Sequence, residues 1–233
     1  MLVNKNNSLR VEDTNFKLFM GNHEIERTTT YRYLGLIVDE KFCWAEHINE
    51  VCTKLSQVAG IMYKIRHCVS KQALKLVYHS LAGSKLRYGL ICWATANKYL
   101  LNKINVAHNN LITVMAFAKR CTRLWPLFCQ IKVLPLEILI QIEYGKTMYK
   151  FTKHMLPVVF NSYFTTPTHH HATRFSTNNN FAVVRITSTK EKSLLKYIGP
   201  KTWTSIPEHI KQAPSLKVFI NSYRNHLIGN YNE

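Results

Sequence analysis

The sequence predicts a mainly α-helical protein with a short β-hairpin near its N-terminus and a small α+β unit at its C-terminus. Two observations carry this prediction. Apolar residues alternate with polar ones only within residues 16–38, whereas between residues 48 and 149 they recur every three or four positions, the period of an α-helix. The chain has 233 residues, 46% of them hydrophobic, so it can bury the core of one large domain or two small ones.

The expected β-structure lies in residues 16–38. Residues 16–20 alternate between apolar and polar, and Gly21-Asn22 is a turn signal. Residues 31–38 are rich in aromatic and β-branched side chains, which favour strands. We therefore expect a small sheet or hairpin in this region.

Two helices are predicted to follow. The first places Ile48, Val51, Cys52, Leu55, Val58, Ala59, Met62 and Ile65 on one face. Ser70 is expected to cap the second, in which Ala73, Leu74, Val77, Tyr78 and Leu81 face inward. Gly83 and Gly89 are the candidates for a kink or a break in that helix.

The second half of the chain is predicted to hold two more long helices and a separate terminal unit. A third helix is expected from about Tyr99 to Arg120, and the basic string at 119–123 would suit its C-terminus. Pro135, at a first helical position, opens a fourth with Leu136, Ile138, Leu139, Ile142 and Tyr149 as its apolar set. Residues 157–180 read as a linker. Beyond it we expect a strand at 181–187, an irregular segment at 197–207 and a terminal helix at 215–227.

The charge of the chain is strongly positive and unevenly distributed. The formal net charge is +18, from 31 Lys and Arg against 13 Asp and Glu. Residues 1–50 hold 6 basic and 8 acidic side chains, so residues 51–233 hold 25 and 5, a net charge of +20. A polyanionic partner is the simplest explanation.

The hydropathy pattern indicates no membrane segment. No run approaches the roughly 18 apolar residues that a membrane span requires, and the polar N-terminus has no signal-peptide core. We therefore expect an intracellular protein, in the cytoplasm or the nucleus, that is not secreted and binds no membrane.

The motifs of common enzymes and metal sites are missing from the sequence. The six cysteines form no C-x-x-C pair and are interpreted as reduced thiols that mostly pack, and His169-His170-His171 as part of a polar loop. Polynucleotide synthesis needs carboxylates that hold two metal ions about 3.5–4 Å apart. The chain has no Asp-Asp pair, and Glu12-Asp13 and Asp39-Glu40 are interpreted as turn or capping residues. We expect no catalytic residue, metal site, cofactor or small-molecule substrate.

Several segments nevertheless resemble one protein family. Residues 30–48, TYRYLGLIVDEKFCWAEHI, are similar to the K-Y-L-G-x-x-(I/L)-D-x-x-L-x-W-x-x-H-I stretch of LINE-type (jockey-like) non-LTR retrotransposon reverse transcriptases. Residues 76–94, LVYHSLAGSKLRYGLICWA, resemble that family's L-Y-x-x-L-x-x-x-x-L-x-Y-G-x-x-x-W segment. HNNLITVMAFAKR at 108–120, KYIGPKTWTSIPEHIK at 196–211 and the helix at 215–227 resemble further family elements in the same order.

This resemblance implies the C-terminal portion of an RNA-directed DNA polymerase. Residues 1–44 would be the end of the palm with the primer-grip hairpin, 45–156 the helical thumb and connection, 157–180 a linker and 181–233 a small C-terminal unit. The primer-grip turn would be Tyr33-Leu34-Gly35, whose glycine lets the backbone approach the primer strand. The catalytic carboxylates and their Mg²⁺ belong to the palm motif that this sequence does not contain, so the fragment is not expected to be active on its own.

The expected partners are RNA and an RNA–DNA hybrid, and DNA is a further candidate. Basic helices would lie along the minor groove of a template–primer duplex and read its shape and phosphates rather than its bases. Together with Tyr33, Leu34 and Gly35, the residues that we expect to contact nucleic acid are Arg66, Lys71, Lys75, Lys85, Arg87, Lys119, Arg120 and Arg123.

Three alternatives remain open from the sequence. The chain could be a non-enzymatic nucleic-acid-binding or assembly module derived from such an element. It could be the product of a decayed element, with apolar surface exposed where it once met the palm. A basic amphipathic helix could also bind a membrane surface, although the helices carry enough apolar residues to pack on one another.

Overall fold

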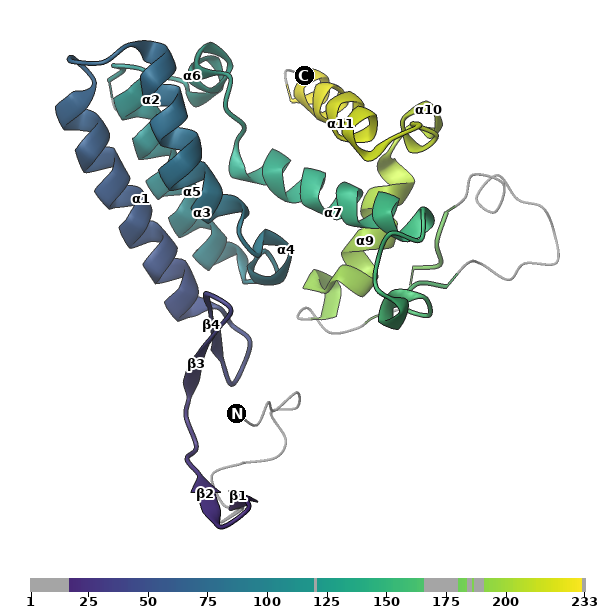
Figure 1. Cartoon of the computed structure of the whole chain (residues 1–233). Coiled ribbons are helices and arrows are strands. Elements are labelled where there is room, and N and C mark those ends of the chain that lie inside the picture. The colour runs from purple at the N-terminus through teal and green to yellow at the C-terminus, as the bar shows by residue number, and fades with distance from the viewer. Residues whose placement is uncertain (1–16, 120, 166–179, 184–185, 187–190, 232–233) are drawn as a thin grey trace.

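The computed structural model describes residues 17–119, 121–165, 180–183, 186 and 191–231. Two short β-hairpins at the N-terminal end lead into a bundle of long helices, and a second group of helices lies beside that bundle (Figure 1). The mainly α fold with a short N-terminal hairpin is confirmed, since 62% of the structure is helical. The predictions for Glu12-Asp13, Arg120 and His169-His170-His171 lie outside the described residues.

The two hairpins account for all strands in the described part of the chain. Strands β1 (Leu18–Met20) and β2 (His23–Ile25) pair antiparallel around Gly21-Asn22, the expected turn. Strands β3 (Thr30–Tyr33) and β4 (Leu36–Asp39) pair with Tyr33 opposite Leu36. Leu34 and Gly35 form the two-residue loop between them with φ of 46° and 84°. Positive φ at both positions is what a type I′ turn requires.

A capped turn connects β4 to the first long helix, α1 (Ala45–Ile65). The Asp39 carboxylate accepts hydrogen bonds from the backbone N–H groups of Lys41, Cys43 and Trp44 at 2.7–3.0 Å. Burial alone would raise the Asp39 pKa, but these donors together with the Cys43 thiol outweigh it and hold the pKa below its ordinary value. Of the turn or capping roles predicted for Asp39, the structure shows the turn.

Helices α1 and α5 (Lys98–Met115) pack along each other and form the first core. Of the predicted inward face of α1, Ile48, Leu55 and Met62 have no exposed surface. Trp93 closes the end of this core near the hairpin, where the Trp44 indole donates to Thr95 Oγ1 at 3.1 Å. The 3.6-residue period of the sequence thus gives the expected buried stripe.

Between α1 and α5 the chain forms a helix that changes pitch and then breaks. Ser70 caps α2 (Lys71–Val77) by accepting from the Ala73 N–H, as predicted. The helix continues as a π-turn, η2 (Tyr78–Gly83), and as α3 (Ser84–Arg87). Gly89, with φ of 59°, ends it before α4 (Leu90–Trp93), so this predicted break is confirmed. The inward orientation predicted for Leu81 is wrong, because its side chain is 43% exposed.

Helix α5 ends at Met115, five residues before the predicted end at Arg120. Phe117 adopts a φ of 56°, and the Ala118 and Phe117 N–H groups bond back to the carbonyls of Thr113 and Val114. This is the Schellman arrangement, which usually has glycine where Phe117 stands. The basic string at 119–123 consequently follows a finished helix and does not form its last turn.

The remaining helices form a second core around α7 (Leu136–Thr152). Pro135 is the residue before this helix rather than its first residue, and the five predicted apolar positions of α7 are buried. Helix α7 packs against α9 (Leu195–Ser205) and α11 (Leu216–Asn230). A Cβ on Gly145 would lie 2.6 Å from Tyr223 Cε1, which shows how closely α7 and α11 approach. The short elements of this half are η3 (Val158–Phe160), η4 (Glu191–Ser193) and α10 (Glu208–Lys211), whereas α6 (Leu124–Ile131) packs on α5.

The C-terminal predictions had mixed outcomes. The terminal helix is confirmed, with Ser215 as its cap. The strand predicted at 181–187 is wrong for the described residues of that range: Phe181 is buried and the Ala182 N–H donates to Thr165 O, but no ladder forms. The prediction of an irregular segment at 197–207 is wrong for most of that range, because α9 extends to Ser205 and includes Pro200. The domain limits, including the linker at 157–180, stay predictions.

Within the described residues no single helix is long and apolar enough to span a membrane, although α6 and α7, bent by 59°, pass that test as a pair.

Candidate nucleic-acid interface

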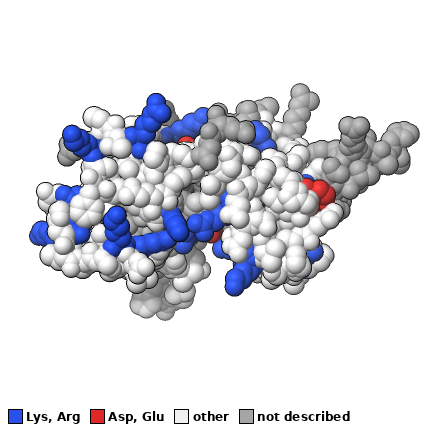
Figure 2. All heavy atoms as spheres, turned by 90° about the horizontal axis from the view of Figure 1, so that it is seen from above, with Lys and Arg blue, Asp and Glu red and all other residues white. Residues whose placement is uncertain are grey.

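The middle of the chain contains no acidic residues. Between residues 51 and 136 there is no Asp or Glu, while the same stretch holds 13 Lys and Arg. This stretch includes most of α1 and all of α2, α3, α5 and α6. Basic side chains gather over this part of the molecule and extend to the boundary with the half that holds α7, α9 and α11 (Figure 2). The positive surface therefore belongs to the helical bundle.

The four cations predicted on α2 and α3 form the best defined part of this surface. Lys71, Lys85 and Arg87 are exposed, and Lys75 is half-buried one turn after Lys71. None of them makes an ion pair with a carboxylate of the described residues. Unpaired cations on one helical segment suit a polyanion, because binding releases counterions and relieves their mutual repulsion.

Arg66 is in a different situation from these four residues. Its guanidinium lies 4.4 Å from the Tyr63 ring centroid and 4.9 Å from that of Phe117, and it donates to the Val114 carbonyl at 3.3 Å. Arg66 thus holds the end of α1 against the end of α5. It is half-buried and structurally engaged, so the structure separates it from the free cations of α2 and α3.

Two of the remaining predicted cations follow the C-terminal end of α5, the end that Arg66 contacts. Lys119 is exposed in the turn after α5, and Arg123 is the exposed residue before α6. Arg120 lies outside the described residues. They share the basic stretch with Lys71 and Lys75, but no interaction joins the two groups in the described structure.

The side chains of the predicted primer-grip turn are exposed, while its backbone is bonded to Tyr88. Tyr33 and Leu34 are 62% and 72% exposed. The Tyr88 hydroxyl donates a hydrogen bond to the Leu34 carbonyl. A Cβ on Gly35 would lie 3.3 Å from Tyr88 Cε1, so in this structure the close approach that glycine permits is to Tyr88.

Further contacts fix the β3–β4 hairpin to the bundle. Arg32 and Glu50 form a salt bridge at 2.8 Å, and the Ile37 N–H donates to His47 Nδ1 at 3.4 Å. Burial lowers the pKa of His47, which favours the neutral imidazole that this acceptor role needs. The exposed turn is therefore presented by a hairpin docked on α1 and on the junction of α3 and α4.

Two residues near the basic surface were missed by the sequence reading. His79 of η2 is half-buried, and burial lowers its pKa, as do the charges of Arg87, Lys75 and Arg224. Arg224 belongs to α11 and lies 145 residues after His79 in the sequence. The spacing of His79 four residues after Lys75 was visible in the sequence, whereas the approach of α11 depends on the tertiary fold.

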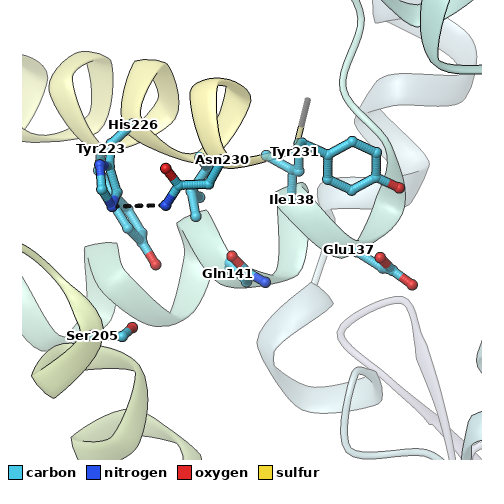
Figure 3. A pocket seen from close by; sticks show the side chains of 9 residues that line it. Glu137, Ile138, Gln141, Ser205, Tyr223, His226, Asn230 and Tyr231 are labelled. Atoms are coloured by element: carbon cyan, nitrogen blue, oxygen red, sulfur yellow. Dashed lines mark hydrogen bonds between the residues drawn. The ribbon is translucent and has the colours of Figure 1, made fainter. Parts of the chain in front are cut away.

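The structure also contains a small cavity beside α11 (Figure 3). Its volume is about 250 Å³, and it lies between α7, the end of α9 and α11. Asn230 donates to His226 Nε2 at 3.2 Å at its edge. The lining includes the Glu137 carboxylate and no Lys or Arg, so the cavity does not suit a phosphate.

The described residues show no alternative chemistry at the basic surface. No three His, Cys, Asp or Glu side chains in the described ranges are placed to hold a metal ion. All six cysteines are free, as predicted, but five are exposed, so the expectation that they mostly pack is wrong. The basic surface has the charge to bind anions.

Comparisons with protein-family models, with curated proteins and with solved structures find no match to this chain.

Proposed function

We propose that this chain binds the phosphate backbone of a nucleic-acid duplex, as the C-terminal, template–primer-contacting part of a non-LTR retrotransposon reverse transcriptase. The observation that carries the proposal is the group Lys71, Lys75, Lys85 and Arg87 on one helical segment, none of them paired with a described carboxylate. The absence of acids from residues 51–136 supports it, because nothing in this stretch would repel phosphates.

The arrangement of hairpin and helices also supports the proposal. The segment that resembles the family's primer-grip stretch is a β-hairpin with an exposed turn, directly followed by α1. The segment that resembles its thumb motif includes η2, α3 and α4. A duplex that contacts these helices would be read through its phosphates and its shape. Polymerase activity is not proposed for this chain alone, because it contains no aromatic-Ala-Asp-Asp motif.

The salt dependence of binding tests this proposal. The affinity of the full chain for an RNA–DNA hybrid should fall with salt, and the double reversal Lys71→Glu/Lys75→Glu should lower the slope of log K against log salt by about 2, since each lost phosphate contact removes about 0.9. Fluorescence anisotropy with a labelled hybrid at several salt concentrations measures this slope.

A matched control variant distinguishes binding at a defined site from attraction by the overall charge of the protein. Lys54→Glu/Lys64→Glu changes the net charge equally, at two exposed positions of α1. We expect it to leave the slope closer to that of the wild type. Equal effects of the two pairs would argue against a defined interface, and the absence of hybrid binding would overturn the proposed function. A hybrid of scrambled sequence should bind equally well, because bases are not read.

A further inference from the structure

Three ring side chains surround the Arg66 guanidinium where α1 ends. Arg66 Cζ lies 4.4 Å from the Tyr63 ring centroid and 4.9 Å from that of Phe117. Arg66 Nε donates to His67 Nε2 at 3.3 Å, and the His67 ring meets the Phe117 ring edge-on at 5.1 Å. A further hydrogen bond to the Val114 carbonyl fixes the guanidinium on the end of α5. The three rings and the guanidinium form a ring cluster that two helix ends hold in place.

The rings of this cluster are fixed in position and yet face solvent. Tyr63 is 59% exposed and Phe117 43%, and His67 is exposed as well. Phe117 reaches its place with a φ of 56°, a left-handed conformation that is unfavourable for any residue with a Cβ. Such strain is typical of ligand clamps and binding loops. The backbone therefore presents an aromatic ring to solvent at a position where glycine would be easier to accommodate.

Tyr99 on α5 shows how the ring cluster differs from an ordinary exposed tyrosine. It is 70% exposed, and the Lys103 ammonium lies 5.1 Å from its ring centroid. Within the described ranges no second aromatic ring contacts it. Single exposed apolar side chains are common on protein surfaces. The arrangement of several rings around one guanidinium, and not exposure alone, distinguishes the end of α1.

We propose that the ring cluster is a stacking site for unpaired bases of a nucleic-acid strand that extends beyond the bound duplex. Aromatic rings stack on bases of any sequence, and an arginine beside them adds a cation–π contribution. The inference rests on the proposed function and deepens it, because it adds a single-strand site to the duplex-binding cations of α2 and α3. In Figure 1 the site lies at the end of α1 that is opposite the β3–β4 hairpin.

The charges around the ring cluster favour a polynucleotide as its occupant. The cluster belongs to the acid-free stretch 51–136, so no neighbour in sequence repels phosphates. Lys119 is exposed two residues after Phe117, and Lys71 is exposed four residues after His67. Four residues of extended chain span at most about 14 Å, so Lys71 lies close enough for one strand to contact both. A single strand supplies the phosphates for these lysines and the planar bases for the rings.

The experiment compares two ligands that differ only in their bases. Both are the same RNA–DNA hybrid with short single-stranded overhangs, which carry ordinary bases in one ligand and abasic sugars in the other. We expect the full chain to bind the ordinary overhangs roughly tenfold more tightly, near the lower end of what one stacked base contributes. Fluorescence anisotropy measures both affinities. Equal affinities would show that the overhang is held through its phosphates alone and would overturn the inference.

Two variants remove rings from the cluster. Tyr63→Ala should reduce the tenfold preference to roughly twofold or less and leave the salt slope unchanged, because the ring carries no charge. Phe117→Gly should also reduce the preference, and it keeps the helix end intact because glycine is the usual residue there. The matched control is Tyr99→Ala, which removes an exposed ring from α5 and should retain the tenfold preference.

The outcomes distinguish this inference from the proposed function. If Lys71→Glu/Lys75→Glu lowers the salt slope but Tyr63→Ala and Phe117→Gly both behave like Tyr99→Ala, the inference fails while the proposed function stands. If the hybrid does not bind at all, both fail. Binding to phosphatidylserine vesicles that is lost in Tyr63→Ala, with an unchanged preference for ordinary overhangs, would assign the rings to a membrane surface and would also overturn the inference.

Discussion

Among the described residues, a deeply buried ionisable pair joins two helices through one hydrogen bond. Tyr78 of η2 and His108 of α5 are 1% and 0% exposed, and 2.8 Å separates the Tyr78 hydroxyl from His108 Nε2. The Phe128 ring covers His108 from α6 at a centroid distance of 5.4 Å. His108 Nδ1 has no hydrogen-bond partner in the described structure. Burial lowers the His108 pKa to about 4, so the imidazole is neutral at pH 7.

This burial predicts an acid-sensitive core. Because the folded-state pKa of about 4 lies below the unfolded value of 6.5, the full stabilisation is present above pH 6.5 and is lost as the pH falls toward 4. Between about pH 7.5 and 4.5 the free energy of unfolding should fall by roughly 2–3 kcal/mol from this group alone. His108→Gln should remove most of that loss, since an amide can still bond to the Tyr78 hydroxyl and does not titrate. Urea unfolding at both pH values measures it.

His67→Gln is the control for this prediction, because His67 is exposed. Its free energy of unfolding should show the same pH dependence as the wild type. His47 also has a pKa lowered by burial, so part of the acid sensitivity should persist in His108→Gln. A pH dependence in His108→Gln identical to that of the wild type would mean that His108 does not stay neutral and buried near pH 4.5.

At the scale of elements, one glycine lets the β3–β4 hairpin approach the helical bundle closely. Gly89 has a φ of 59° and ends α3 before α4. A Cβ at this position would lie 2.7 Å from Leu36 Cδ2 and 2.8 Å from Leu36 Cδ1. Leu36 is the first residue of β4, so the absence of a side chain at Gly89 lets the hairpin contact the helical bundle.

Gly89→Ala should therefore loosen the hairpin more than the bundle. The left-handed conformation costs a non-glycine residue about 1–2 kcal/mol, and the contact with Leu36 adds to this cost. Hydrogen exchange followed by mass spectrometry should show faster exchange in β3 and β4, with little change in the middle of α1 and α5. Equal protection of the hairpin in the variant and the wild type would contradict this view of the docking contact.

Gly60→Ala provides the opposite case in the same experiment. Gly60 lies within α1, and a Cβ there would meet no atom within 4 Å. Alanine is favoured over glycine in a helix interior by roughly 0.5–1 kcal/mol. This substitution should raise the free energy of unfolding and leave hairpin exchange unchanged.

The elements whose ends depend on local chemistry were predictable from the sequence. Ser70 caps its helix as expected, the terminal helix begins directly after Ser215, and Gly21-Asn22 forms the expected turn. The end of α5 was not predictable, because Phe117 occupies a position that glycine usually takes. Its ring meets His67 at 5.1 Å and the Arg66 guanidinium at 4.9 Å, and these tertiary contacts offset the strain of its positive φ.

Helix α9 illustrates the same limit. Gly199 and Pro200 read as breakers, yet both are buried within the helix. A Cβ at Gly199 would lie 2.8 Å from the Met148 sulfur, so a side-chain-free position allows α9 to approach α7. Packing between distant segments outweighs the helix-breaking tendency of these residues.

The candidate site also has features that the sequence predicts and features that depend on tertiary packing. The free cations of α2 and α3 follow from helical periodicity and charge, which a sequence displays directly. The contact of Arg66 with the Tyr63 ring depends on how the two side chains are placed. The effect of Arg224 on His79 depends on how two segments far apart in the sequence fold together. Neither can be predicted from helical periodicity. A sequence therefore reveals which residues can bind phosphate more readily than which of them are free to do so.

At the scale of the whole molecule, the net charge of +18 is compensated by few internal partners. Five salt bridges occur among the described residues, and three involve the acidic N-terminal segment: Lys17–Glu24, Arg27–Glu40 and Arg32–Glu50. The acid-free stretch 51–136 forms none of them. The folded state thus concentrates repulsion in the bundle, and exposed ion pairs elsewhere contribute little to its stability.

This balance predicts that salt stabilises the protein. Raising NaCl from about 0.05 M to about 0.5 M shortens the screening length to a few ångströms and should weaken repulsion more than attraction. We expect a gain on the order of 1 kcal/mol, equivalent to roughly 2–4 °C in Tm for a chain of this size. The triple variant Lys71→Gln/Lys75→Gln/Arg87→Gln should have a higher Tm than the wild type at low salt and a smaller increase with NaCl, as differential scanning calorimetry would show. A Tm that decreases with NaCl would mean that ion pairs dominate, and the unpaired cations of α2 and α3 would then not be the source of strain that a nucleic acid relieves.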